Sequence, residues 1–114
     1  KDVAFSRDSR LLATASVDGP IKLWNPATGS ELAPLRGHQT QVDSVAFAPD
    51  GVTLASIEEN QGVRLWHLPT RREVAVVPVA DAGSWLGFVP GGQSLALRLF
   101  GGGLRLLPAP REEV

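Results

Sequence analysis

The sequence predicts an all-β fold built from repeated units of short antiparallel strands, and two observations lead to this prediction. First, a segment of three residues that ends in Phe occurs three times, at offsets of 42 and then 41 residues. Second, a strand-like segment that ends in Trp or Leu follows each Phe, and its last residue always lies 19 positions after the Phe. The first segment occurs as Val3-Ala4-Phe5, Val45-Ala46-Phe47 and Leu86-Gly87-Phe88, and the second as Ile21-Lys22-Leu23-Trp24, Val63-Arg64-Leu65-Trp66 and Leu104-Arg105-Leu106-Leu107.

A repeat of roughly 40 residues that contains several strands is the sequence signature of a propeller blade. One blade cannot bury both of its faces alone, so blades stack against each other. The 114 residues hold fewer than three full repeats, whereas propellers usually close with about four to eight blades. We therefore expect a partial β-propeller of four-stranded antiparallel blades that belongs to a longer protein. Blade 1 is expected over about 1–36, blade 2 over about 37–79 and an incomplete blade 3 over about 80–114.

Each predicted strand is a short run of alternating apolar residues bounded by turn residues. In the first repeat the strands are expected near residues 2–5, 11–16, 20–24 and 31–35. In the second they are expected near 43–47, 53–57, 62–67 and 73–78, and in the third near 84–88, 94–99 and 103–107, with a stub at 112–114. No window has a helical period long enough to compete with this pattern.

The turns between strands support this division. Ala48-Pro49-Asp50-Gly51 places Pro at the second turn position and Gly where a positive φ is needed, and Val89-Pro90-Gly91-Gly92 repeats this arrangement. The first repeat has Ser9 where Gly is preferred, so we expect local backbone strain there. Gly101-Gly102-Gly103 is expected to be a loose hairpin turn, since it lacks the Lys that follows the glycines of a phosphate-binding loop.

The third strand of a repeat has apolar residues on both faces. Ile21 and Leu23 share one face of the first such strand, and Trp24 lies on the other. Burial of Trp removes a large apolar area from water, so the natural cover for this second face is the next blade. Pro34 fits an outer strand, which leaves one edge unpaired.

Composition argues against several classes of function. A hydrophobic content of 43% and a charged content of 20% are globular values, and a net charge of -1 gives no broad attraction to nucleic acid or to anionic membranes. The lack of Cys removes disulfides, thiolate catalysis and Cys metal sites. No apolar run approaches a membrane span, and we expect a cytoplasmic protein. Arg outnumbers Lys, and Tyr and Met are absent, which suggests a GC-rich bacterial source.

The repeated residues resemble the WD-repeat (WD40-type) β-propeller family. The second repeat has the family's features in their usual order, namely Gly37-His38, Phe47, Pro49-Asp50-Gly51, Leu54-Ala55-Ser56 and Leu65-Trp66. The first repeat matches with Phe5, Leu12-Ala13-Thr14, Ser16, Asp18 and Leu23-Trp24. The resemblance covers essentially the whole chain, as about two and three-quarter repeats of which the third is degenerate. It implies a WD-repeat propeller.

In this family a buried hydrogen-bond network joins a loop His, a Ser or Thr on the second strand, a turn Asp and the Trp indole. The Asp fixes the tautomer of the His ring, and the indole N–H finds a buried acceptor. Carried over by position, the network residues are Thr14 or Ser16, Asp18 and Trp24 in the first repeat, and His38, Ser56, Asn60 and Trp66 in the second. Asn60 stands at the Asp position and accepts without charge assistance. The third repeat has Gly101 and Leu107 at the Asp and Trp positions, so no network is expected there.

No group of residues predicts catalysis or a metal site. Asp18 and His38 belong to different blades, and no Gly-x-Ser-x-Gly elbow accompanies them. We expect His38 to hold its loop and His67 to face solvent. Neither is expected to bind zinc, because two His without Cys or clustered carboxylates do not make a zinc site. Glu58 and Glu59 are adjacent and point to opposite faces, so they are expected to form a charged turn rim and not an acid–base pair. We therefore expect no enzymatic activity, no cofactor and no metal.

What remains is an interaction surface. In the family, partners usually dock on the face formed by the turns between second and third strands and by the loops that lead into the first strands. The expected contact residues are Val17, Glu59 and Phe100 in the turns, with Arg36, Gln39, Thr40 and Gln41 in the loop. Phe100 either anchors a partner, as exposed aromatic residues often do, or fills a gap in the degenerate third blade.

The resemblance favours a non-catalytic scaffold that positions a protein partner, or a neighbouring domain of the same chain, on a rigid ring. The alternative is a propeller module of a larger kinase- or protease-fused enzyme, which would present substrate to an active site outside this segment. Neither nucleic acid nor membrane is expected as a partner. The remaining blades are expected from sequence beyond the segment, with self-association as the alternative.

Overall fold

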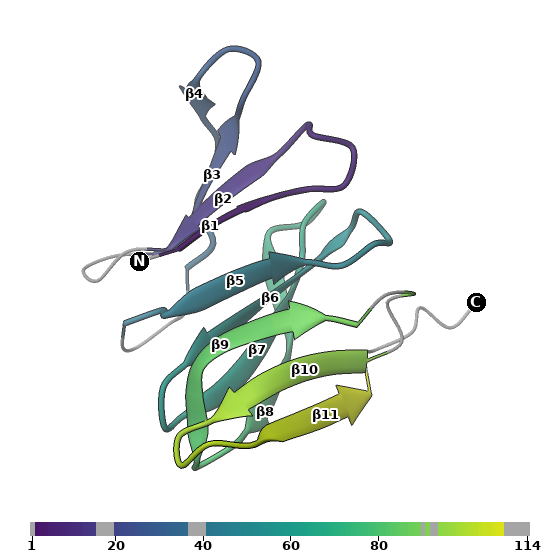
Figure 1. Cartoon of the computed structure of the whole chain (residues 1–114). Helices are drawn as coiled ribbons and strands as arrows, with labels where there is room; N and C mark the ends of the chain where they lie inside the picture. Colours follow the sequence, from purple (N-terminus) through teal and green to yellow (C-terminus); the bar gives the residue numbers. More distant parts are fainter. Residues whose placement is uncertain (1, 16–19, 37–40, 90, 92–93, 109–114) are drawn as a thin grey trace.

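The computed structural model describes residues 2–15, 20–36, 41–89, 91 and 94–108, which form three antiparallel sheets (Figure 1). We call these sheets blades 1, 2 and 3. The strand orders are β1-β2-β3-β4, β5-β6-β7-β8 and β11-β10-β9, so neighbours in sequence pair throughout. None of the described residues lies in a helix of the length and apolar character that a membrane crossing needs. The predicted all-β fold is confirmed.

The strands follow the repeat closely. Blade 1 contains β1 (Asp2–Phe5), β2 (Leu12–Ala15), β3 (Lys22–Asn25) and β4 (Ser30–Glu31). Blade 2 contains β5 (Ser44–Phe47), β6 (Thr53–Glu58), β7 (Gly62–His67) and β8 (Arg72–Pro78). The described part of blade 3 contains β9 (Ala82–Phe88), β10 (Ser94–Leu99) and β11 (Leu104–Pro108). The expected stub at 112–114 lies outside the described residues.

The blades stack in sequence order, with blade 2 between the other two (Figure 1). Side chains alternate between the two faces of each strand, so one blade has two faces to bury. One buried cluster joins Ile21 and Leu23 of blade 1 to Leu54 and Trp66 of blade 2. A second joins the opposite face of blade 2 to blade 3, through residues that include Ile57, Val63, Leu65, Leu86, Leu95 and Leu97. Blade 2 is therefore covered on both faces, as the apolar patterning of its strands predicts.

A carboxylate joins the first strands of blades 1 and 2. Asp2 Oδ2 accepts a hydrogen bond from Ser44 Oγ at 2.9 Å and one from the Val45 backbone N–H at 3.0 Å. Asp2 Oδ1 also accepts from the Val3 N–H at 2.9 Å. Hydrogen bonds to a charged acceptor are stronger than neutral ones, so this contact fixes how β1 lies against β5.

The fourth strand of blade 1 is shorter than predicted. The sequence predicts a strand near 31–35, but β4 contains only Ser30–Glu31, and Leu35 pairs with Ile21 through an isolated bridge. The Leu32 and Leu35 N–H groups still donate to carbonyls of the third-strand segment, at 2.7 and 2.9 Å. Pro34 has no N–H and a fixed φ, which interrupts a regular ladder between these contacts.

The turns have the backbone conformations that the sequence predicts. Ser9 has a φ of 62°, in the left-handed region that favours Gly, and its N–H donates to the Ser6 carbonyl at 3.0 Å. Gly51 has a φ of 78°, and Gly102 and Gly103 have values of 88° and 109° in the hairpin between β10 and β11. The strain expected at Ser9 is therefore present.

Candidate functional site

Two Trp–hydroxyl pairs stand at equivalent places in blades 1 and 2. The Trp66 indole Nε1–H donates to Ser56 Oγ at 2.9 Å, and both side chains are fully buried. The Trp24 Nε1–H donates to Thr14 Oγ1 at 3.0 Å in a partly buried setting. The Trp66–Ser56 pair joins β7 to β6, and the Trp24–Thr14 pair joins β3 to β2. In both cases the two strands are adjacent in their sheet. Of the other expected network residues, Ser16, Asp18 and His38 lie outside the described residues.

Asn60, the remaining network residue, lies exposed in the turn between β6 and β7. Its φ is 63°, a left-handed conformation that Asn tolerates better than most residues. Its backbone N–H donates to the Ala82 carbonyl at 2.9 Å, which ties this turn to the start of blade 3. The structure thus gives Asn60 a backbone role in joining blades 2 and 3.

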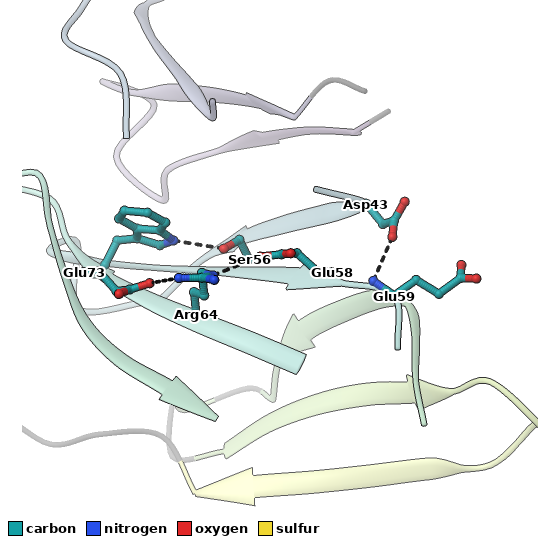
Figure 2. Close-up of polar contacts among 7 residues, drawn as sticks. Asp43, Ser56, Glu58, Glu59, Arg64 and Glu73 are labelled. Carbon is teal, nitrogen blue, oxygen red and sulfur yellow. Dashed lines mark hydrogen bonds and ion pairs between the residues drawn. The ribbon is translucent and has the colours of Figure 1, made fainter. Parts of the chain in front are cut away.

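Glu58 is buried, which corrects the expectation that it forms part of a charged turn rim. It is the last residue of β6, and its Oε1 accepts a hydrogen bond from Arg64 Nε at 2.9 Å. Arg64 Nη1 also bridges to Oε1 of Glu73 on β8 (Figure 2). Burial by itself lowers the pKa of Arg64, but the hydrogen bonds and charges of Glu73 and Glu58 outweigh it and raise that pKa above its usual value. A buried carboxylate is thereby compensated by a partner charge.

The sequence contains a signal for this ion triad that was not recognised. Arg64 is opposite Ser56 in the β6–β7 register, and Glu58 lies two pairs further along, so all three share one face of blade 2. Glu73 pairs with Trp66 across β7 and β8 and lies on the same face. Opposite charges near each other on one face of a predicted hairpin indicate an ion pair, although their burial depends on distant packing.

The loops at one edge of the blades are tied together in a row, which we call the turn face: residues 41–43, 59–61, 79–81 and 100–103. Asp43 Oδ2 accepts from the Glu59 N–H at 3.0 Å (Figure 2). Asn60 is held to Ala82, and the Phe100 N–H donates to the Asp81 carbonyl at 2.7 Å. The Asp43 carboxylate thus orders the turn within blade 2, the Phe100–Asp81 bond orders the loops within blade 3, and the Asn60–Ala82 bond links the two blades.

The expected partner residues that are described lie at or beside this face. Glu59 is exposed, and Figure 2 shows its side chain extending away from the sheet. Gln41 Nε2 donates to Asp43 Oδ1 at 2.7 Å, and Arg36 is exposed in the segment after β4. Phe100 has an exposed fraction of 65%, so it does not fill a gap in blade 3. Val17, Gln39 and Thr40 lie outside the described residues.

The described residues show no arrangement for catalysis. His67 Nδ1 lies 3.0 Å from Thr70 Oγ1 in an exposed turn, and Ser56 Oγ is occupied by the Trp66 indole. In the parts of the chain that the structure describes, no three His, Cys, Asp or Glu residues gather as metal ligands would.

A comparison with models of known protein families identifies the family of this chain. The sequence model described as "WD domain, G-beta repeat" matches residues 1–25 and 29–67, which is more than half of the chain. The chain therefore belongs to the WD-repeat family, as the repeat pattern and the stacked four-stranded blades indicate. The match does not extend over the third repeat, where Gly101 and Leu107 replace the family's Asp and Trp.

Curated relatives are similar over part of their length. The chain is 38% identical over 63 residues to lissencephaly-1 homolog 1 of Paramecium tetraurelia, covering 55% of this chain and 16% of that protein. It is 33% identical over 94 residues to pre-mRNA-processing factor 19 homolog 2 of Arabidopsis thaliana, covering 82% and 18%. It is 31% identical over 93 residues to eukaryotic translation initiation factor 3 subunit I of Aspergillus oryzae, covering 82% and 28%. The chain thus spans less than a third of each, and these eukaryotic relatives do not support the bacterial source suggested by composition.

Solved structures agree on the fold. The β-propeller domain of Cps50 (Swd1) from Myceliophteria thermophila has a TM-score of 0.83 at 25% identity, covering 96% of this chain and 35% of that one. Hydrazine synthase of Kuenenia stuttgartiensis has a TM-score of 0.87 at 17% identity, covering 94% and 32%. At that identity the second likeness shows the fold alone. The predicted partial β-propeller is confirmed.

Proposed function

We propose that this chain is part of a non-catalytic WD-repeat scaffold that holds a protein partner, or a neighbouring domain of its own chain, on the turn face. The observation that carries the proposal is Phe100, which is 65% exposed while its backbone is held by the Asp81 carbonyl. An aromatic side chain presented on a fixed backbone buries a large area on binding at a small cost in conformational entropy.

The row of hydrogen bonds along the turn face supports the same role. Asp43 holds the turn at Glu59, and Asn60 holds the start of blade 3. A surface that is ordered before binding loses less entropy when a partner docks. Polar groups of the same turn face, among them the exposed Glu59, are then available as a rim around an aromatic anchor, which is the usual anatomy of a protein interface.

The test compares a Phe100→Ser variant with the unchanged chain as baits, with bound proteins quantified by mass spectrometry. We expect at least one specifically bound protein to be recovered about tenfold less by the variant, because loss of an interface anchor costs more than about 1.4 kcal/mol. Arg7→Ala is the matched control, since Arg7 is exposed in the β1–β2 turn at the opposite edge of the blades. Circular dichroism of all three proteins checks that the fold is unchanged.

Recovery of every partner to the same extent by Phe100→Ser and the unchanged chain would show that the turn face is not the docking site. Equal losses for Phe100→Ser and Arg7→Ala would also contradict the proposal, because only the first residue belongs to that face.

A further inference from the structure

Phe100 is the exposed aromatic residue of the turn face, and two exposed carboxylates lie in its neighbourhood. The Phe100 N–H donates to the Asp81 carbonyl at 2.7 Å, so these two residues are adjacent across the loops of blade 3. Glu59 precedes Asn60 and Asp81 precedes Ala82, and the Asn60 N–H donates to the Ala82 carbonyl at 2.9 Å. Main-chain hydrogen bonds therefore hold one aromatic and two acidic side chains in the same part of the surface, and all three are exposed.

The segments of the turn face carry charges of one sign. Residues 41–43, 59–61, 79–81 and 100–103 include Asp43, Glu59 and Asp81, and they contain no Lys, Arg or His. The turns at the opposite edge of the blades carry charges of both signs, namely Arg7, Asp8, Arg10, Asp50 and Arg71. The two edges of the stack therefore offer different electrostatic surfaces to a partner.

The cations nearest to the turn face lie elsewhere or are already bound. Neither the Glu59 nor the Asp81 carboxylate is paired with a cation within the described part of the chain. The guanidinium of Arg64 is bound by two carboxylates of its own blade. Arg98 lies on the outer face of blade 3, and Arg36 belongs to blade 1 at the other end of the stack. A cation from a partner thus meets carboxylates that no described cation neutralises.

We propose that the turn face recognises an Arg side chain in a basic segment of the partner protein, with the guanidinium lying on the ring of Phe100 and facing Glu59 and Asp81. This inference rests on the proposed scaffold function and specifies the chemistry of its partner. A guanidinium is planar, so it can stack on an aromatic ring while its N–H groups donate to carboxylates, which the ammonium of Lys does less well. An acidic partner or a nucleic acid would meet charges of its own sign.

The test uses a synthetic peptide, Ser-Arg-Gly-Arg-Gly-Arg-Ser, titrated into the full 114-residue chain labelled with nitrogen-15, with backbone amide shifts followed by NMR. We expect saturable shifts at Glu59, Asp81 and Phe100. A peptide with citrulline in place of Arg has nearly the same shape without the charge, and it should bind about tenfold more weakly. A peptide with Lys in place of Arg has the same charge and should bind about threefold more weakly, since Lys does not stack as Arg does. Light scattering checks that the mass of the chain stays constant.

Variants of the chain locate the site. Glu59→Lys and Asp81→Lys should each weaken binding of the Arg peptide about fivefold, because attraction becomes repulsion. Glu31→Lys is the matched control, since Glu31 is exposed on β4 and undergoes the same change of charge away from the turn face. Phe100→Leu keeps an apolar side chain but removes the ring, and it should weaken binding about threefold. An unchanged unfolding temperature checks that each variant keeps its fold.

The absence of saturable shifts at the turn face would overturn the proposal, and so would equal binding of the Arg and citrulline peptides. Equal weakening by Glu31→Lys and by the two turn-face substitutions would also overturn it, because only the net charge of the chain would then matter. Equal binding of the Arg and Lys peptides would overturn the stacking on Phe100.

The scaffold function has a separate outcome. If a protein still requires Phe100 for its recovery on the bait while the Arg peptide does not bind, the scaffold proposal stands and the basic partner is wrong. If no recovered protein depends on Phe100, the scaffold proposal fails whatever the peptide does.

Discussion

Trp24 and Trp66 occupy equivalent positions 42 residues apart, and each indole donates to a hydroxyl of the neighbouring strand. They differ in their surroundings. Blade 1 covers Trp66 completely, whereas Trp24 remains partly exposed on the outer face of blade 1. The same local pattern therefore contributes different amounts to stability, because burial depends on the neighbouring blade and not on the repeat itself.

This difference predicts the effect of substitutions in the repeat. Trp66→Ala should lower the free energy of unfolding by about 3–5 kcal/mol, as truncation of large aromatic residues in packed sites does. Trp24→Ala should cost less, and so should Leu107→Ala at the partly buried third-repeat position. Equilibrium denaturation by urea, followed by circular dichroism, measures all three. A Trp66→Ala protein as stable as the unchanged chain would contradict the stacked-blade packing.

At the scale of strands, β6, β7 and β8 are joined by more than their backbone ladders. Arg64 on β7 binds Glu58 of β6 and Glu73 of β8, so one guanidinium connects three strands (Figure 2). The two carboxylates differ in exposure, since Glu58 is buried and Glu73 is about one-third exposed. Ion pairs shielded from water are weakened less by solvent and salt than exposed ones.

Substitution of each carboxylate separates the two contacts. Glu58→Gln should lower the free energy of unfolding by about 1–3 kcal/mol, because the partly buried hydrogen bond from Arg64 to the buried Glu58 loses its charged acceptor. Glu73→Gln should cost less than about 1 kcal/mol, as exposed ion pairs do. Urea denaturation at low and at high salt measures both losses of stability. The part of the loss that remains at high salt should be smaller for Glu73→Gln than for Glu58→Gln. Equal costs for the two variants would mean that burial does not strengthen the Glu58 contact.

The strands and turns were largely predictable from the sequence, because they depend on local alternation and on turn residues. Ser9 has the strained φ that its place in the turn indicates, and the first and second repeats divide into strands close to the predicted limits. The burial of Glu58 and the short length of β4 were not predicted. The burial of Glu58 depends on Arg64 and Glu73 from other strands, and β4 ends early because Pro34 interrupts its ladder. For Phe100 the sequence left two interpretations open, and only the packing of blade 3 distinguishes them.

At the scale of the whole molecule, the two ends of the stack are unlike its middle. Val45 on the blade 1 side of blade 2 is 3% exposed, whereas Val3, its equivalent on the outer face of blade 1, is 57% exposed. Phe5 on the same outer face is also exposed, and Leu104 and Leu106 are exposed on blade 3. In blade 2 the residues at these positions are covered by a neighbouring blade, so the outer face of blade 1 has the composition of a surface that another blade covers.

The isolated chain should therefore self-associate through its outer blade faces as concentration rises. Replacement of Phe5 by Ser should lower the mass measured by light scattering on a sizing column at high concentration, because it removes an exposed apolar side chain without altering the interior. Arg7→Ala, in the adjacent turn, is the control and should leave the mass unchanged. A chain that stays monomeric at every concentration, with strong β signal in its circular dichroism spectrum, would show that three blades are stable without a neighbour on either side. A folded dimer that Phe5→Ser converts to monomer would instead show that the outer face of blade 1 is itself an interface.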